Sequence, residues 1–162
     1  MLIRKAQLKD LADINEIYNH AILNLTATFD EEIKTSQERQ EWFASHQDLQ
    51  YPLIVAEDKG EVVGWGTISP FRPRTAYRFS GETSIYVRND MYGQGIGTFL
   101  LKELIILAGE NNLHTIFGII VDDNNSSIKL HSKLGFEKVG YLKGAGFKFN
   151  RWLDIIIMQK ML

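Results

Sequence analysis

The chain has 162 residues, of which 44% are apolar and 23% are charged, and its formal net charge is -2. This balance is typical of one globular domain with a buried core, and it gives no general attraction to nucleic acid or to anionic membranes. The absence of cysteine excludes disulfides, thiolate zinc sites and cysteine nucleophiles. Residues 1–5 lead into a strand-like pattern and do not resemble a signal peptide. No apolar run is long enough to span a membrane. We therefore expect a cytoplasmic enzyme or binding domain.

The N-terminal half predicts a strand, two helices and a strand hairpin. Apolar residues recur at the helical period after Leu8, a polar segment at residues 24–30 interrupts them, and Thr35 with Glu38 forms a capping-box signature for a second helix. Residues 58–60 have the composition of a hairpin turn. We expect, in order, a strand at Leu2–Ala6, a helix at Leu8–Leu25, a helix from Thr35 to about His46 anchored by Trp42 and Phe43, and strands at Pro52–Ala56 and Glu61–Ile68.

Residues 70–78 form a predicted loop with three arginines and two aromatic residues. This composition fits a solvated basic loop. It fits equally a wall that binds a carboxylate or a phosphate, because the planar guanidinium pairs with such groups through two parallel hydrogen bonds. The loop by itself does not decide between these two roles.

The C-terminal half predicts two strand–helix pairs and a closing hairpin. We expect a strand at Tyr77–Val87, a helix from Ile96 to about Asn111, a buried strand at His114–Val121, a helix at Ser126–Leu134 ended by Gly135, and strands at Phe136–Phe149 and Trp152–Met161 around a turn at Asn150–Arg151. The central strand–helix–strand unit predicts a parallel pair with a right-handed crossover. The fold class is therefore α/β, a twisted mixed sheet of about seven strands with helices on both faces, in one domain over residues 1–162.

Gly93, Gly95 and Gly97 stand at alternate positions where a helix begins. The first turn of a helix has unpaired N–H groups and a partial positive charge, and glycine lets an anion approach them, so this stretch predicts a phosphate or pyrophosphate site. The third glycine comes one residue too early for a dinucleotide-binding fingerprint, and no Gly-Lys-Ser/Thr run follows as in a P-loop. Both of those nucleotide sites are therefore disfavoured.

The glycine stretch and the strand before it resemble the acetyl-coenzyme A (acetyl-CoA) loop of the GNAT superfamily of N-acetyltransferases. Residues 82–90 (ETSIYVRND), 126–140 (SSIKLHSKLGFEKVG) and 146–154 (GFKFNRWLD) are similar to the phosphinothricin and methionine-sulfoximine acetyltransferase branch. The similarity runs from about Ile3 to the C-terminus. Tyr92 is a departure, since superfamily members usually have Arg or Gln at that position.

The resemblance implies how acetyl-CoA would be bound, and it implies no metal. It assigns the pantetheine arm to the main chain of Ile85, Tyr86 and Val87, as an added strand, and the pyrophosphate to the amides of Gly93, Gln94, Gly95, Ile96, Gly97 and Thr98. Asn124 is similar to a cofactor-contacting Asn of the family, and Lys133 could reach a phosphate. From its local sequence alone, Asn124 could equally be a plain N-cap of the next helix. Lys133 alone could be an ordinary surface charge.

Glu82 is the candidate general base, because it stands on the same strand with only two residues between it and the segment assigned to pantetheine. The alternative for Glu82 is an ion pair with Arg78. His131 resembles the residue that many related enzymes supply as Tyr near the departing sulfur, where it could protonate the thiolate. Its alternative is a structural hydrogen bond on a helix face. A backbone N–H near Val87 is the candidate donor to the developing oxyanion.

The acceptor contacts follow from the same resemblance. It places them at Arg72, Pro73, Arg74, Glu82, Thr83 and Ser84, with Phe29 and Tyr77 as apolar neighbours. In related enzymes the loop that corresponds to residues 70–78 lies near a subunit interface, so a homodimer is implied. Lys148 and Trp152 belong to the C-terminal block, and we expect Trp152 to lie in the core.

The leading interpretation is an acetyl-CoA-dependent N-acetyltransferase. It would act on the α-amino group of phosphinothricin, methionine sulfoximine or methionine sulfone, by direct attack without a covalent enzyme adduct. A second hypothesis keeps the cofactor but changes the acceptor to a protein N-terminus, a polyamine or an aminoglycoside, although the arginines of residues 70–78 disfavour a polycation. Two further hypotheses are a non-catalytic acetyl-CoA-binding module and an anion or nucleotide binder without acyl chemistry.

Overall fold

The computed structural model describes residues 1–46 and 50–162 and contains one seven-stranded mixed sheet in the order β1-β2-β3-β4-β5-β7-β6. The strands are β1 (Leu2–Lys5), β2 (Leu53–Asp58), β3 (Glu61–Pro70), β4 (Ser80–Val87), β5 (Thr115–Val121), β6 (Glu137–Lys148) and β7 (Arg151–Met161). The α-helices in this part of the chain are α1 (Leu11–Asn24), α2 (Ser36–Ser45), α3 (Ile96–Glu110) and α4 (Asn125–Lys133). The predicted α/β sheet of about seven strands is confirmed.

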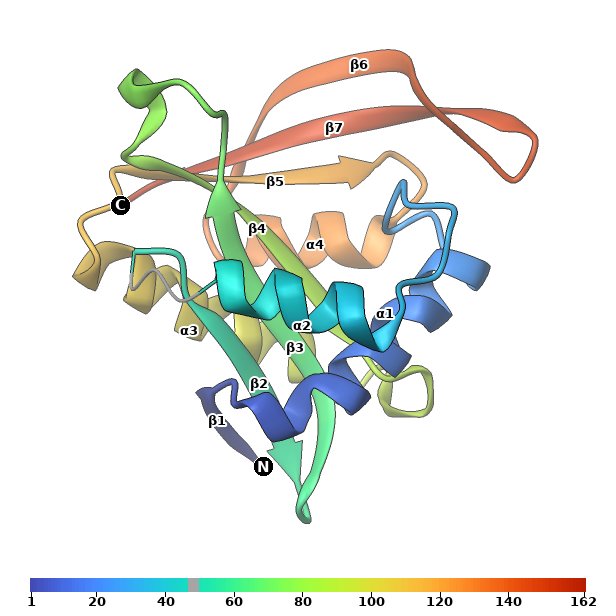
Figure 1. Cartoon of the computed structure of the whole chain (residues 1–162). Coiled ribbons are helices and arrows are strands. Elements are labelled where there is room, and N and C mark those ends of the chain that lie inside the picture. Colours follow the sequence, from blue (N-terminus) through green and yellow to red (C-terminus); the bar gives the residue numbers. More distant parts are fainter. Residues whose placement is uncertain (47–49) are drawn as a thin grey trace.

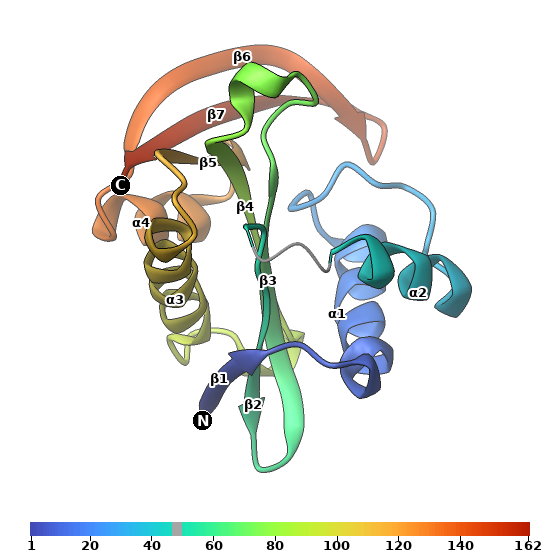
Figure 2. The same ribbon diagram turned by 60° about the vertical axis from the view of Figure 1, so that its left-hand side comes forward.

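The helices cover both faces of the sheet, as predicted. Figure 2 shows α3 and α4 on one face and α1 and α2 on the other. Leu100 and Leu104 of α3 are completely buried in the larger core cluster, and Ile14 of α1 is completely buried in a second cluster with Val55 and Trp65 of the sheet. Within the described residues, no helix combines the length and the apolar character that a bilayer crossing requires.

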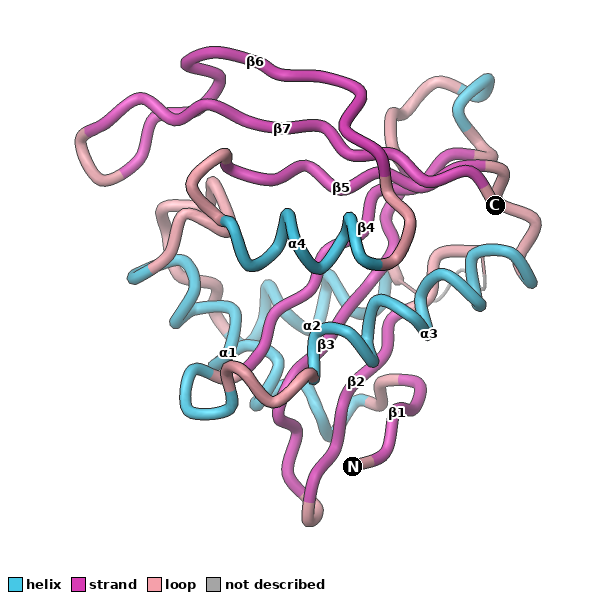
Figure 3. Tube along the Cα trace, turned by 180° about the vertical axis from the view of Figure 1, so that it is seen from behind, coloured by secondary structure: helices cyan, strands magenta, loops and turns pink. Residues whose placement is uncertain are grey.

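The central strands β4 and β5 form the expected parallel pair, and the other neighbouring strands of the sheet are antiparallel. Ser80–Glu82 pairs with Thr115–Phe117, and the pairing then stops although both strands continue. On their outer edges β4 remains paired with β3, and β5 with β7. The two strands therefore part within the sheet and leave two inner edges facing each other, which Figure 3 shows from behind the molecule.

Strands β6 and β7 form a long hairpin that projects beyond the rest of the molecule (Figure 1). Its turn uses Phe149 and Asn150, both with positive φ, so the predicted turn at Asn150–Arg151 is one residue late. The expectation that Trp152 lies in the core is wrong, because its side chain is 71% exposed. Trp152 stands at the far end of the hairpin, where its ring contacts Phe147 edge-on.

Other predicted boundaries need correction. The strand predicted from Tyr77 begins at Ser80, since Thr75–Tyr77 forms a 3₁₀ turn. Strand β3 continues past Ile68 through Pro70, because Ser69 and Pro70 pair with β4. The helix predicted from Leu8 starts with a 3₁₀ turn, Leu8–Asp10. The carboxylate of Asp10 forms an ion pair with the guanidinium of Arg4. The predicted capping box at Thr35 and Glu38 is confirmed, and it starts α2.

Gly81 provides a test of the packing around the junction of β4 and β5. A methyl group on Gly81 would overlap Ile68 Cγ2 and would lie 3.2 Å from Leu113 Cδ1. Gly81→Ala is therefore expected to lower the free energy of unfolding by about 1–3 kcal/mol. The matched control is Gly109→Ala in α3, where nothing lies within 4 Å of an added methyl group. This control should raise the free energy of unfolding by about 0.5–1 kcal/mol. Urea denaturation measures both changes, and a Gly81→Ala variant as stable as the wild type would contradict this packing.

Candidate functional site

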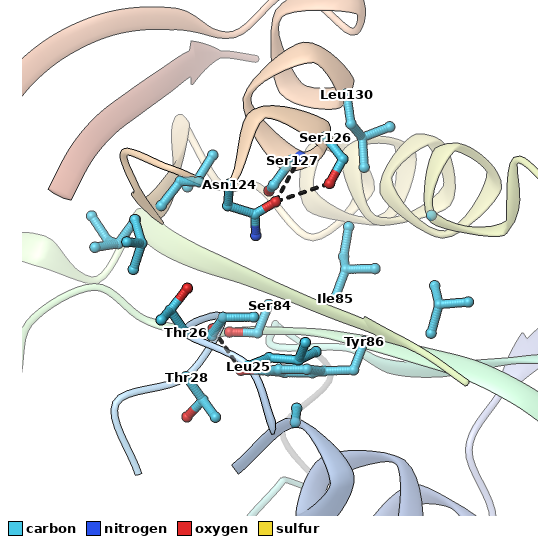
Figure 4. A pocket seen from close by; sticks show the side chains of 18 of the residues that line it. Leu25, Thr26, Thr28, Ser84, Ile85, Tyr86, Asn124, Ser126, Ser127 and Leu130 are labelled. Carbon is cyan, nitrogen blue, oxygen red and sulfur yellow. Dashed lines mark hydrogen bonds between the residues drawn. The ribbon is translucent and has the colours of Figure 1, made fainter. Parts of the chain in front are cut away.

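A cavity of about 900 Å³ opens where β4 and β5 part. Residues 82–87 of β4 and 118–121 of β5 line it, together with the loop at residues 25–29. The remaining walls come from Gly93 and Gly97 at the start of α3 and from residues of α4. Figure 4 shows the side chains of Asn124, Ser126 and Leu130 across the cavity from those of Ser84 and Tyr86.

The unpaired inner edge of β4 suits an extended ligand. Beyond Glu82, its backbone N–H and C=O groups pair with no described strand on this side, and buried backbone groups require hydrogen-bond partners. Side chains alternate along the strand as predicted, so Ile85 packs against the α3 core while Tyr86 packs against Trp65 on the other face. An arm with amide groups could bind in this gap as an added strand.

The start of α3 has the geometry expected of an anion site. Gly93 and Gly95 have φ of 78° and 80°, in the left-handed region that favours glycine, and Gly95 is the N-cap of the helix. Gly93 and Gly97 line the cavity, whereas Ile96 is buried in the core. The lining residues do not include Gln94, Gly95, Ile96 or Thr98. The first-turn amides of α3 therefore lie at one end of the cavity, beside two positions without side chains.

Asn124 is the N-cap of α4, the role that its local sequence predicted as an alternative to cofactor binding. Its side-chain oxygen accepts hydrogen bonds from the Ser127 N–H (3.1 Å) and the Ser126 hydroxyl (2.9 Å), so it is the N-cap of α4. It also lines the cavity, and its position is shown in Figure 4. Lys133, at the end of α4, is not among the lining residues.

Glu82 lines the cavity at the point where β4 and β5 part. Burial raises the pKa of the Glu82 carboxyl, and the positive charge of Arg72 opposes this shift. The alternative ion pair between Glu82 and Arg78 is absent from the described residues. Arg78 instead donates a hydrogen bond to the Thr75 carbonyl and stacks over Phe79. A carboxyl of raised pKa in a cleft is a candidate proton-transfer group.

His131 combines a structural hydrogen bond with a free ring nitrogen. The ring is 5% exposed, and Nδ1 lies 2.8 Å from the Ser127 carbonyl oxygen, so we assign the proton to Nδ1. Nε2 then carries a lone pair, and it has no hydrogen-bond partner among the described residues. Burial lowers the pKa of His131, and the hydrogen bond to Ser127 partly offsets that shift. The neutral ring can therefore accept a proton at Nε2.

Gly118 of β5 makes room for this ring. A methyl group on Gly118 would lie 2.8 Å from both Cδ2 and Nε2 of His131. Residues 118–121 were not predicted from the sequence to be part of a site. The isolated glycine within an apolar strand was the available signal, because such a glycine often marks the close approach of another group.

Of the loop at residues 25–29, the sequence predicted only Phe29 as part of the site, and residues 25–28 were missed. Lys148 fixes the position of this loop. Lys148 is 2% exposed, and its ammonium group donates hydrogen bonds to the carbonyl oxygens of Leu25 (2.8 Å) and Thr28 (2.7 Å). Gly146 contributes to the same contact, since the ring of Phe29 occupies the space that a side chain would need. No spacing in the sequence indicates that a lysine of β6 binds a loop more than a hundred residues earlier.

The predicted acceptor residues are divided between the cavity and its surroundings. Glu82, Thr83, Ser84 and Phe29 line the cavity. Arg72, Pro73, Arg74 and Tyr77 are exposed residues outside the lining. Arg72 stacks over Phe71, whose ring in turn stacks on Phe117 of β5. Residues 1–46 and 50–162 contain no group of three His, Cys, Asp or Glu side chains that could hold a metal ion.

Known proteins are similar to this chain in sequence and in fold over nearly its whole length. The family model for an acetyltransferase (GNAT) domain matches residues 3–157. An L-methionine sulfoximine/L-methionine sulfone acetyltransferase from Pseudomonas aeruginosa is 42% identical over 158 residues, which cover 97% of this chain and 92% of that protein.

Two crystal structures superpose closely on the chain. A ribosomal-protein-alanine N-acetyltransferase from Brucella melitensis has a TM-score of 0.98 and 42% identity, with 100% of both chains covered. A phosphinothricin acetyltransferase from Sinorhizobium meliloti, solved in complex with acetyl-CoA, has a TM-score of 0.96 and 41% identity, with 99% of this chain and 88% of that chain covered.

Replacing Lys148 by methionine tests whether it holds the loop at residues 25–29. Lys148→Met leaves two buried carbonyl groups without their donor, so we expect the free energy of unfolding to fall by about 2–3 kcal/mol. Amide hydrogen exchange of residues 25–30 should become faster. The control is Lys143→Met, which removes an exposed lysine from the same strand. Equal exchange in the two variants would show that Lys148 does not fix the loop.

Proposed function

Because the chain belongs to the GNAT family of N-acetyltransferases, we propose that it acetylates the α-amino group of a small amino-acid-like acceptor. The candidate acceptors are methionine sulfoximine, methionine sulfone and phosphinothricin, which appear in the names of relatives. The observation that carries this proposal is the position of Glu82, a half-buried carboxylate of raised pKa at the junction of two parted strands. Its place matches the need to remove a proton from an ammonium group before the amine can attack.

The cofactor of the reaction is acetyl-CoA, which supplies an activated acetyl thioester. In this proposal the main chain of residues 85–87 binds the pantetheine arm, and the amides of residues 93–98 bind the pyrophosphate. Asn124 and Lys133 complete the contacts to the coenzyme. The parted strands and the left-handed glycines before α3 support this arrangement, because they provide free backbone groups where an arm and an anion need them.

Glu82 accepts a proton from the acceptor's ammonium group, and the neutral amine then attacks the thioester carbonyl carbon. A backbone N–H near Val87 stabilises the negative charge that develops on the oxygen. As the C–S bond breaks, the attacking nitrogen loses its second proton. His131 takes that proton at Nε2 and passes it to the departing sulfur. The bare Nε2 of the neutral ring supports a role that begins with proton uptake.

Arg72 and Arg74 bind the acceptor's carboxylate in this proposal, next to Pro73, and Thr83 and Ser84 complete the contacts near Glu82. The effect of Arg72 on the pKa of Glu82 supports the assignment, because it brings the positive charge of the loop near the reacting amine. This arrangement binds both polar groups on the α-carbon of the amino acid. The amine is directed to Glu82 and the carboxylate to the arginines.

A protein N-terminus is the second candidate acceptor. The relative from Brucella melitensis that superposes with a TM-score of 0.98 is named for ribosomal-protein alanine. An N-terminal alanine presents the same α-amino group but has a peptide bond in place of the carboxylate. Parallel thiol-release assays with free methionine sulfone, phosphinothricin and an alanine-initiated peptide separate the two candidates. No turnover of any free amino acid would exclude the small-acceptor proposal.

Glu82→Gln tests the proposed base. The variant should lose about 10²–10⁴-fold in kcat, measured by thiol release, because no other group is assigned to take the ammonium proton. Glu110→Gln, an exposed carboxylate at the end of α3, is the control and should keep wild-type activity. Wild-type turnover by Glu82→Gln would remove Glu82 from the mechanism.

The pH dependence gives a second test of Glu82. A base acts when deprotonated, so the wild-type kcat/KM should rise as the pH increases through the raised pKa of Glu82. This acidic limb should be absent from the residual activity of Glu82→Gln. Because burial favours the protonated form, ionisation of Glu82 costs folding stability as the pH rises through that pKa. The Tm of Glu82→Gln at neutral pH should therefore equal or exceed that of the wild type.

We also propose that the protein is a cytoplasmic homodimer. The cysteine-free chain has no need of an oxidising compartment, and the hairpin of β6 and β7 carries exposed apolar side chains. These are Val139, Leu142, Phe147, Phe149 and Trp152. Large apolar side chains gathered on a projecting hairpin are typical of an association surface.

Trp152→Glu tests the homodimer. The substitution places a charge at the most exposed of these side chains, and it should shift the protein from dimer to monomer in sedimentation velocity. Lys143→Glu, on the same hairpin but polar in the wild type, should remain dimeric. A wild-type protein that sediments as a monomer at all concentrations would refute the proposed dimer.

A further inference from the structure

A second cavity, of about 600 Å³, lies on the face of the sheet that carries α1 and α2. Its lining includes residues of α2 and of strands β3 and β4, and Figure 1 shows α2 crossing in front of these two strands. Tyr18, Ser84 and Tyr86 line this cavity and the first one as well. The two cavities therefore meet along the same side chains of β4.

Arg39 of α2 lines the second cavity and is buried, and it forms no ion pair within residues 1–46 and 50–162. Its side chain is 4% exposed, and its guanidinium lies 4.8 Å from the ring centre of Tyr18 and 4.5 Å from that of Trp42. Nε donates a hydrogen bond to the Asn15 side chain, but Nη2 has no acceptor among the described residues. A buried guanidinium in this condition is costly unless another molecule supplies an acceptor.

Trp65 adds a second donor of the same kind. This side chain of β3 lines the cavity, is 2% exposed, and its Nε1–H also lacks an acceptor in the described part of the chain. The guanidinium of Arg39 lies 5.9 Å from the Trp65 ring centre. Two unsatisfied N–H donors at one cavity are unusual in a folded protein, since most buried polar groups have partners.

The carboxylates of Asp30, Glu38 and Glu41 line this cavity, and each already has a hydrogen-bond partner; Glu41 accepts a hydrogen bond from the Gln37 side chain. Asp30 accepts a hydrogen bond from the Tyr18 hydroxyl and pairs with Lys34, while Glu38 accepts hydrogen bonds from Thr35 at the start of α2. These groups line the same cavity but form no ion pair with Arg39. Arg39 is thus left free to interact with oxygen atoms of a ligand.

The register of β3 and β4 connects Glu82 to this cavity. Ser69, which lines the second cavity, pairs directly with Glu82, and the next two pairs along the same face are Thr67 with Ser84 and Trp65 with Tyr86. Successive pairs on one face are separated by about 7 Å along the strand. An acceptor whose amine reaches Glu82 can therefore extend its side chain along Ser69 and Ser84 toward Arg39.

We propose that this second cavity binds the distal end of the acceptor's side chain, and that Arg39 is a specificity-determining residue for oxygen atoms there. The inference rests on the proposed amino-acid acetylation and names the part of the acceptor that the enzyme selects. A sulfone, a sulfoximine or a phosphinate offers two hydrogen-bond acceptors on one central atom, which matches the two free donors of Arg39 and Trp65. The methyl group that each of them carries would contact the aromatic rings around Arg39.

Methionine sulfone and methionine form a matched pair for the test, since they differ only in two oxygen atoms on sulfur. The wild type should show a kcat/KM at least about tenfold higher for the sulfone, because a site with buried donors rejects a ligand that leaves them unpaired. Arg39→Met should abolish this preference by raising the KM for the sulfone, with the KM for acetyl-CoA and the kcat/KM for methionine nearly unchanged.

Further variants separate recognition from folding. Arg39→Lys keeps the charge but lacks the planar fork, so it should retain only part of the preference. Trp65→Phe removes the second donor while keeping an aromatic ring, and it should also reduce the preference. Lys102→Met on the exposed surface of α3 controls for loss of a positive charge and should behave as wild type. Preference is a ratio measured within one variant, so it stays meaningful where stability falls.

Calorimetric titration of the same two ligands, without acetyl-CoA, decides the inference independently of turnover. Tighter binding of the sulfone by the wild type, lost in Arg39→Met, supports the site even if neither ligand is acetylated, in which case only the proposed function fails. Equal affinities of the wild type for both ligands, or a preference that Arg39→Met retains, would overturn the role of Arg39.

Discussion

The structure depends on the parting of β4 and β5 in the middle of the sheet. The two parallel strands are paired over three residues each and then diverge, while their outer edges stay paired with β3 and β7. Backbone groups on the inner edges therefore lie in a cleft, where no described strand pairs with them. A molecule with amide groups can satisfy them, and the starts of α3 and α4 supply further backbone and polar groups at the same opening.

Because side chains alternate along β4, one face of the strand packs into the core and the other faces the cavity. Ile85 packs into the core under α3, which fixes the strand, while Glu82 and Ser84 belong to the opposite face and line the cavity. Lys148 then holds the loop at residues 25–29 as another wall. Because this wall and the β4 edge come from distant parts of the chain, the site exists only when the sheet is complete.

Local signals in the sequence predicted most of the fold. The capping box at Thr35, the apolar period of α3 and the alternation in β4 each describe interactions between residues a few positions apart. The glycines before α3 likewise predicted a helix start that an anion can approach. The structure adds that Gly93 and Gly95 have left-handed backbone. Boundaries such as the start of β4 failed because pairing with a neighbouring strand, not local preference, sets where a strand begins.

The sequence by itself determined the order of the elements, the family and the residue types available for proton transfer, since these follow from local patterns and motifs. Only the tertiary structure decided which groups meet. It placed Arg72, rather than Arg78, where its charge lowers the pKa of Glu82, and it exposed Trp152. It also left Nε2 of His131, beside Gly118, without a hydrogen-bond partner in the described part of the chain. It also buried Arg39 among aromatic rings, with no ion pair to any described carboxylate. The physical reason is that burial and partner choice depend on packing between segments far apart in the chain, which spacing along the sequence does not encode.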